Sequence, residues 1–137
     1  MISFDATIVS AAEDQWIYKA IWREGGDGDD EKYLMLQRLK HPTLTERIFG
    51  FTKVYIEVCG QGWSWYGQIN RFVLSDMTVR VELSRCAARE MVDDGIVEIT
   101  YRLEPEKRTE WLAIIYRIFD GSKFFEKTKS SNLFFKS

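Results

Sequence analysis

The chain has 137 residues, of which 45% are hydrophobic and 29% charged, proportions of an ordinary globular domain that exclude extensive disorder. Its formal net charge is −2; residues 122–137 hold a local charge of +3, so the other 121 hold −5, and such an acidic body excludes the basic stripe of a nucleic-acid-binding protein. No apolar run approaches the roughly 18 residues of a membrane-spanning helix, which argues against a membrane partner.

The first half of the chain predicts four strands separated by turns. The strands are expected at residues 3–10, 15–23, 32–39 and 53–59. The segment GGDGDDE at 25–31 predicts a hairpin loop, because its glycines permit tight turns and its acids are solvated. Pro42 ends the third strand, and residues 43–49 predict a short helical turn or an irregular crossover.

The second half predicts a β-hairpin, a short helix and a further strand. The strands are expected at residues 68–74, 77–83 and 96–103. Residues 75–76 supply the turn of the hairpin. Ser84 is a suitable N-cap for a short helix over 85–91, since its hydroxyl can accept from a free backbone N–H.

The longest predicted helix begins at Pro105, where the missing N–H of proline costs nothing. Its apolar side chains recur on one side at helical spacing. They are Trp111, Leu112, Ile115, Ile118 and Phe119. Burying this stripe on the sheet should contribute about 1.5–3 kcal/mol for each side chain. Gly121 is a natural C-cap.

This order of elements predicts an α+β fold: a single antiparallel sheet of about six or seven strands, which could be strongly curved, with the C-terminal helix on one face and the short helix between late strands. Residues 1–121 should form one domain. Residues 122–137 form a basic, phenylalanine-rich extension. Because a free tail would expose four phenylalanines, we expect it to pack on the domain or on a neighbouring chain, which would also permit a homodimer.

The sequence has few of the residue patterns that form catalytic sites. His41 is the only histidine, no serine lies in a nucleophile elbow, and no glycine loop has phosphate-binding spacing. Glu57, Asp76 and Glu98 could meet as paired carboxylates, although solvated acids on strand faces are the commoner explanation. We therefore expect a protein that is not an enzyme and needs no cofactor.

The sequence predicts neither a metal site nor a disulfide. Three aspartates at 27–30 raise the question of calcium, but the run lacks the ligand spacing of an EF-hand loop. Cys59 and Cys86 lack metal-ligand spacing. With no basic-then-apolar signal segment at the N-terminus, we expect reduced thiols and a cytoplasmic protein without a bound metal.

The most informative segment is VYIEVCGQGWSWYG at 54–67. It starts as an alternating strand, two glycines then interrupt it, and three aromatics follow. Trp63 and Trp65 should share one face of an extended backbone, with Ser64 and Tyr66 on the other. Either the tryptophans pack into the core, or part of the cluster is exposed as an anchor for a partner. Base stacking is disfavoured, because no lysine or arginine lies nearby to contact phosphates.

At this segment the chain resembles the Immunity protein 10 family of bacterial polymorphic toxin systems. The resemblance rests on YLMLQR at 33–38, VYIEVCGQGWSWYGQI at 54–69, LSDMTVRV at 74–81 and IVEITYRL at 96–103. Its most specific part is the central glutamate followed by glycine-glutamine-glycine, serine and tyrosine-glycine. The two tryptophans and the phenylalanine-rich tail depart from the family pattern. The resemblance implies a cytoplasmic antidote that binds a toxin domain without catalysis or cofactor.

Our leading hypothesis is therefore an immunity protein that neutralises a cognate toxin domain through a surface around this segment. The candidate partner-binding residues are Glu57, Gln61, Trp63, Ser64, Trp65 and Tyr66, with Asp27, Asp29 and Asp30 of the acidic loop. The aromatics would anchor the toxin, and the acids would attract its cations. Glu57, Gln61 and Ser64 could instead hydrogen-bond internally and hold the loop. The alternative function is a small-ligand or peptide-binding module with an aromatic-lined cleft.

Overall fold

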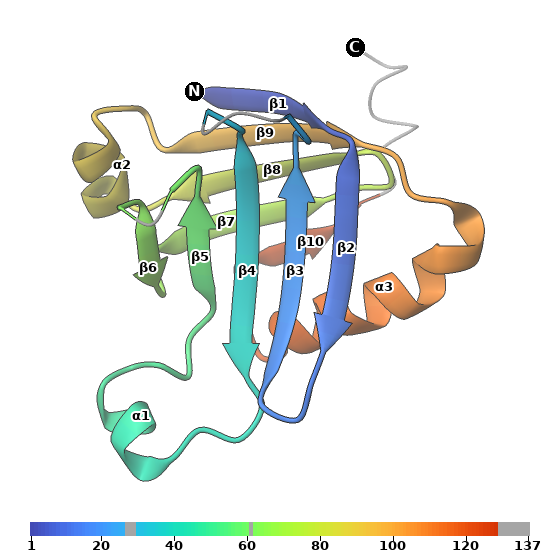
Figure 1. Cartoon of the computed structure of the whole chain (residues 1–137). Coiled ribbons are helices and arrows are strands. Elements are labelled where there is room, and N and C mark those ends of the chain that lie inside the picture. Colours follow the sequence, from blue (N-terminus) through green and yellow to red (C-terminus); the bar gives the residue numbers. More distant parts are fainter. Residues whose placement is uncertain (27–29, 61, 129–137) are drawn as a thin grey trace.

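The structure, a computed structural model, describes residues 1–26, 30–60 and 62–128, and these ranges form two five-stranded sheets and three helices (Figure 1). Sheet A has the order β1 (Ile2–Ala6), β9 (Ile96–Tyr101), β8 (Thr78–Leu83), β7 (Ile69–Leu74) and β10 (Phe125–Lys127). Sheet B has the order β2 (Ile8–Glu13), β3 (Ile17–Arg23), β4 (Tyr33–Leu39), β5 (Tyr55–Val58) and β6 (Ser64–Tyr66). The strands of sheet B run across those of sheet A, and the two sheets enclose the core between them (Figure 1).

The prediction of a single antiparallel sheet was wrong. There are two sheets, and sheet A is mixed, because β1 pairs with β9 and β10 pairs with β7 in parallel. The expected strand over residues 3–10 is divided at Thr7, where the chain leaves sheet A and enters sheet B. Two hydrogen bonds from Thr7 fix this corner. Its N–H donates to the Arg23 carbonyl at 2.9 Å, and its hydroxyl donates to the Glu24 carbonyl at 2.7 Å. Alternation of apolar residues continues through the corner, so the pattern alone hides the change of sheet.

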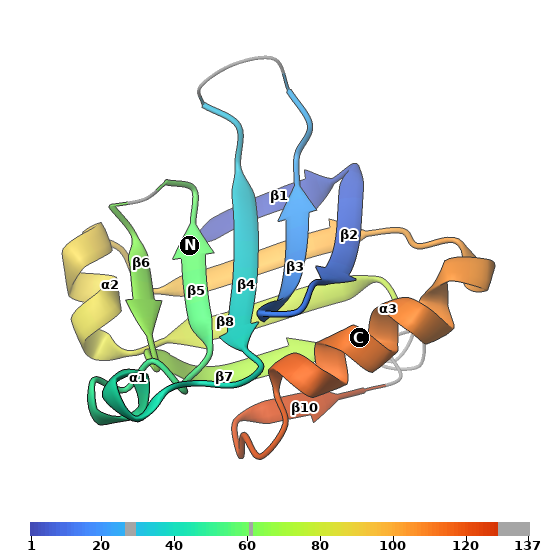
Figure 2. The ribbon, with the colours of Figure 1, turned by 60° about the horizontal axis from the view of Figure 1, so that its bottom comes forward.

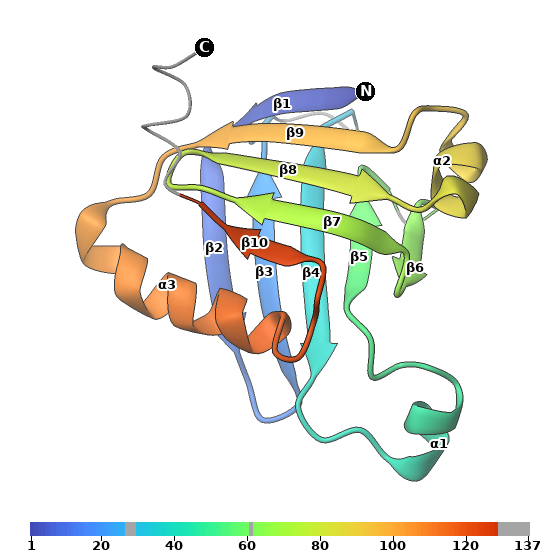
Figure 3. The ribbon, with the colours of Figure 1, turned by 180° about the vertical axis from the view of Figure 1, so that it is seen from behind.

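The helices are α1 (Leu44–Ile48), α2 (Arg85–Met91) and α3 (Pro105–Ile118). The predicted N-cap of α2 is confirmed, since the Ser84 hydroxyl accepts from the Ala87 N–H at 3.1 Å. The apolar stripe of α3 is confirmed as well, with Trp111, Ile115 and Ile118 buried. Figures 2 and 3 show α3 beside β10, continuing the layer of sheet A and packing against β2, β3 and β4. Neither α3 nor any other described helix is both long and apolar enough to cross a membrane.

Trp22 joins the two sheets and α3. Its ring, on the inner side of β3, is fully buried. The centroid of its ring lies 6.1 Å from that of Phe72 in β7, 6.3 Å from that of Tyr101 in β9 and 5.8 Å from that of Trp111 in α3. One indole therefore contacts three elements that are far apart in sequence, and the aromatic packing adds to the area it buries.

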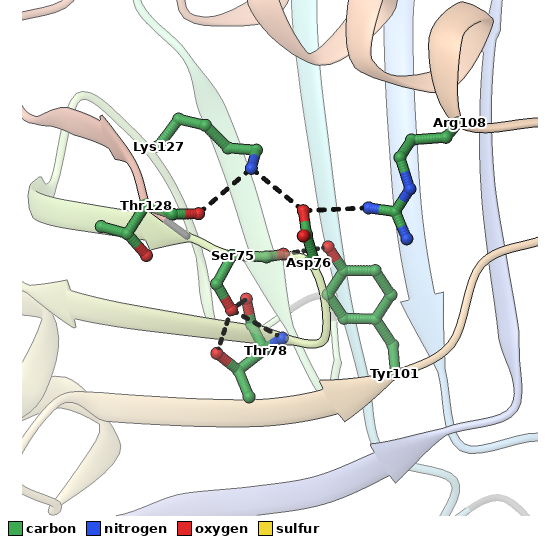
Figure 4. A network of polar contacts seen from close by, with 7 residues as sticks. All are labelled: Ser75, Asp76, Thr78, Tyr101, Arg108, Lys127 and Thr128. Carbon is green, nitrogen blue, oxygen red and sulfur yellow. Dashed lines mark hydrogen bonds and ion pairs between the residues drawn. The ribbon is translucent and has the colours of Figure 1, made fainter. Parts of the chain in front are cut away.

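The turn between β7 and β8 contacts both α3 and β10, the edge strand of sheet A (Figure 4). The Asp76 carboxylate accepts from Arg108 of α3 and from Lys127 of β10, each at 3.2 Å. The Ser75 hydroxyl accepts from the Thr78 N–H at 3.0 Å and shapes the turn itself. The Asp76 pairs are partly exposed, so they contribute orientation more than free energy of folding.

The start of the C-terminal extension packs on the domain. Phe125 of β10 stacks on Phe119 with ring centroids 4.5 Å apart and meets Tyr116 of α3 at 5.9 Å. The pairing of β10 with β7 places this segment at an edge of sheet A. Residues 129–137 lie outside the described residues, and a homodimer through the tail stays a prediction.

Replacing Trp22 with alanine should lower the free energy of unfolding by about 3–5 kcal/mol, because a large cavity would open where the sheets and α3 meet. Trp16 is the matched control, since its side chain is 66% exposed. Trp16→Ala should change stability by no more than about 0.5 kcal/mol. Urea denaturation followed by circular dichroism measures both. Equal losses in the two variants would contradict a core centred on Trp22.

Candidate functional site

The outer face of sheet A is a ladder of charges that pair with one another. Arg71 of β7 contacts Glu126 of β10 at 2.5 Å and Glu82 of β8 at 3.6 Å. Arg80 of β8 contacts Glu98 of β9 at 2.5 Å. These side chains are about half exposed and are satisfied within the sheet, which is the usual state of a solvated strand face.

The outer face of sheet B has a different character. Leu34, Leu36, Ile56 and Val58 point into the core and are fully buried. The alternate residues point outward, and we call them the open face: Tyr33, Met35, Gln37, Tyr55, Glu57, Ser64 and Tyr66. In Figure 1 none of the helices and strands formed by the described residues lies over this face of β4, β5 and β6. Aromatic and sulfur-containing side chains are thus left at the surface of a rigid sheet.

Glu57 lies at the centre of the open face, opposite Met35 on one side and Ser64 on the other. Its side chain is only 9% exposed. The Tyr33 hydroxyl donates to Oε2 of Glu57, and the Tyr55 hydroxyl donates to Oε1 at 2.8 Å. Of the ion pairs within the described ranges, none includes Glu57. Its carboxylate is therefore held by two phenols and not by a cation.

Both phenols remain protonated donors well into the alkaline range. Burial, followed by the hydrogen bond to Glu57, raises the pKa of Tyr33 far above its ordinary value. Burial also raises the pKa of Tyr55; a hydrogen bond with Ser64 acts against this rise and the bond to Glu57 adds to it. Ser64, Tyr55, Glu57 and Tyr33 consequently form one polar chain across three strands.

A row of aromatic rings continues from this polar chain to α1. Tyr66 meets Tyr55 at 5.1 Å and Phe51 at 4.8 Å, and Phe51 meets Phe49 at 6.1 Å between ring centroids. We call Leu44, Ile48, Phe49 and Phe51 the apolar arm. None of the α1 residues is buried, and Leu44 and Ile48 are 74% and 73% exposed. The row and the arm form one exposed apolar surface beside Glu57.

Local hydrogen bonds, and not packing in the core, stabilise α1. The Thr43 hydroxyl accepts from the Glu46 N–H at 3.1 Å, and the Glu46 carboxylate accepts from the Thr43 N–H at 2.8 Å. This capping box explains how a helix without buried residues forms at all. Figure 1 shows α1 standing away from both sheets, which leaves the apolar arm accessible.

Trp63 and Trp65 share the inward side of the sheet, as their spacing predicts. Trp65 lies opposite the buried Ile56, and both indoles pack against the edge of the core. The Trp65 N–H donates to the Glu90 carboxylate at 2.7 Å and so links β6 to α2. Their visible contacts belong to the fold, and a role in binding a partner stays a prediction for both.

The acidic loop between β3 and β4 is only partly described. Asp27 and Asp29 of this loop lie outside the described residues, as does Gln61 between β5 and β6. Asp30 is exposed, and the neighbouring Glu31 pairs with Arg23 at 2.8 Å, which lowers the pKa of Glu31. Within the described ranges, no three histidine, cysteine or carboxylate side chains gather in a way that could hold a metal ion.

Glu57, Asp76 and Glu98 do not converge. Asp76 pairs with Arg108 and Lys127 in the β7–β8 turn, and Glu98 pairs with Arg80 on the outer face of sheet A. A cavity of about 670 Å³ lies at the corner between β1 and β2. Its lining includes Thr7, Met77 and Tyr101, and it is separate from the aromatics at 63–66.

Sequence reasoning missed Tyr33, Tyr55 and the apolar arm. Two features could have indicated them. Tyr33, Tyr55 and Glu57 occupy outward positions of two predicted strands, so pairing those strands would bring them together. The Thr43–Glu46 capping box followed by three apolar residues within 48–51 indicates a short helix with an apolar surface.

Comparison with known proteins gives one match. The family model described as Immunity protein 10 matches residues 5–109, which is 105 of the 137 residues. The matched range includes the whole described open face and the apolar arm. No curated protein and no solved structure matches the chain.

Stability at alkaline pH should depend on Tyr33. Its folded-state pKa is raised above the unfolded value of about 10, so its contribution is complete below about pH 10 and is lost as the pH rises toward the folded value. Tyr33→Phe should therefore lose less stability than the wild type between about pH 9 and pH 11. Urea midpoints at both pH values measure this. Trp16→Phe, which keeps every tyrosine, should retain the wild-type dependence, and an identical dependence in Tyr33→Phe would refute the assignment.

Proposed function

The chain belongs to the Immunity protein 10 family, and we propose that it binds and neutralises the toxin domain of a bacterial polymorphic toxin system through the open face and the apolar arm. The observation that supports this surface is the contrast between the two sheets. Sheet A pairs its outer charges internally, whereas a row of aromatic rings runs from Tyr55 and Tyr66 of sheet B through Phe51 to Phe49. The preceding helix α1 adds the exposed Leu44 and Ile48. An apolar patch of this kind on a small domain marks a site of protein contact.

The chemistry of the surface suits tight inhibition. Nanomolar binding requires about −12 kcal/mol, and a standard interface of about 1,600 Å² can supply it when a few aromatic anchors dominate. Tyr66, Phe51 and Phe49 offer such anchors, and Leu44 and Ile48 extend them. Because the open face lies on a paired sheet and α1 is internally capped, little conformational entropy is lost on binding.

The protein would act by covering the toxin and not by modifying it. The projecting arm can reach into a recess of the toxin while the open face lies on the surrounding surface, so that substrate is excluded. Such inhibition requires neither catalysis nor a cofactor. The acidic body, Glu57 and the aspartates of the 27–30 loop would favour a basic toxin domain and speed its approach in the bacterial cytoplasm.

Tyr66→Ala and Phe51→Ala should each weaken binding by about tenfold or more, since each removes an aromatic anchor. The ligand for the test is the toxin domain encoded beside this chain's gene, carrying a substitution that abolishes its activity. Binding is measured by calorimetry after co-purification of the wild-type pair.

Tyr116→Ala is the control for that experiment. Tyr116 lies on α3, away from the open face, and is 48% exposed compared with 38% for Tyr66. Its replacement should leave the dissociation constant within about twofold of the wild type. Absence of any complex, or equal weakening by all three variants, would reject the proposed surface.

A further inference from the structure

We propose that Glu57 is the receptor for one cationic side chain of the toxin partner, an arginine in preference to a lysine, which enters the open face beside Tyr33 and Tyr55. The inference rests on the proposed function and specifies the chemistry of the partner at the centre of the interface. It makes Glu57 a determinant of specificity.

The first support is the unused hydrogen-bonding capacity of the carboxylate. Two carboxylate oxygens offer about four acceptor positions. The Tyr33 and Tyr55 hydroxyls occupy one position on each oxygen. Counting only hydrogen bonds from described residues, one position on each oxygen is left, which is the number that a bidentate guanidinium fills. The phenols also fix the carboxylate in place before the partner arrives.

The second support is that two nearby cations, Arg23 and Lys40, are already engaged, while Lys19, opposite Gln37, makes no ion pair with Glu57 among the described residues. Arg23 lies opposite Tyr33 in the β3–β4 register, close to the open face. Its guanidinium donates to both Glu31 oxygens, at 2.8 and 3.0 Å, and not to Glu57. Lys40, at the other end of β4, pairs with Glu13 at 2.7 Å. In the described part of the chain, Glu57 thus has no ionic partner.

The third support is the cost of that arrangement. Glu57 as a residue is 9% exposed, and burying a carboxylate without a cation costs free energy that a glutamine at the same position would not. Pairing with a partner's cation would recover this penalty at the moment of binding. The two phenol rings beside Glu57 favour an arginine over a lysine, because a flat guanidinium can stack on aromatic rings.

The test compares Glu57→Gln with Glu82→Gln, using the inactivated toxin domain described above. Glu82 lies in the charge ladder on the outer face of sheet A, so the two variants change the net charge equally. Glu57→Gln should weaken binding at least tenfold, whereas Glu82→Gln should stay within twofold. Thermal unfolding of each variant verifies that it is folded.

A double-mutant cycle separates pairing from a merely structural role. Each arginine and lysine of the toxin surface is changed to alanine, and binding is measured against wild type and Glu57→Gln. Replacing one particular cation of the toxin should weaken binding to the wild-type chain tenfold or more. The same replacement should leave binding to Glu57→Gln almost unchanged. If Glu57→Gln does not fold, the scan against the wild type decides: one arginine or lysine must still cost tenfold, and the absence of any such residue overturns the inference.

The outcomes distinguish this inference from the proposed function. Binding that is sensitive to Tyr66→Ala but unchanged by Glu57→Gln overturns the cation receptor and leaves the surface standing. The inference is also overturned if every toxin cation, when replaced, weakens binding equally to the wild type and to Glu57→Gln. Failure of the wild-type chain to bind the toxin domain rejects the proposed function itself.

Discussion

The packing of Trp22 against both sheets and α3 is the constraint on which the rest of the structure depends. One indole meets Phe72 and Tyr101 of sheet A and Trp111 of α3, so that all three elements share a single core. Because α3 continues the layer of sheet A, it covers the inner side of sheet B and none of its outer side (Figure 3). Among the described elements, none therefore covers the open face.

The two outer faces show two ways of treating the solvent side of a sheet. On sheet A, Arg71 and Arg80 neutralise neighbouring glutamates, and the face needs no further partner. On sheet B, Glu57 is surrounded by aromatic side chains and held by phenols. Among the described residues, the second arrangement leaves apolar area exposed and the Glu57 carboxylate without a cation, which are costs that an unbound domain would avoid. Both costs are removed if another protein covers the face.

The family match and the folded unit have different limits. The match ends at residue 109, within α3, whereas Trp111, Ile115 and Phe119 of the core lie beyond it. β10 also lies beyond the match and is held by Phe125 on Phe119 and by Lys127 on Asp76. The matched region therefore contains the candidate surface, and the following residues complete the core that supports it.

The sequence by itself determined the local structure. Alternation predicted the hairpin over 68–83, the apolar stripe predicted α3, and the spacing of Trp63 and Trp65 placed both on one side of the sheet. It also indicated the family and drew attention to Glu57. Only the tertiary structure decided that the segment over 3–10 divides between two sheets, that β1 and β10 pair in parallel, and that Tyr33 and Tyr55 converge on Glu57. Alternation separates the two faces of a strand, but it does not state which distant strand lies beside it or which face remains uncovered, because these depend on pairings between residues far apart in the chain.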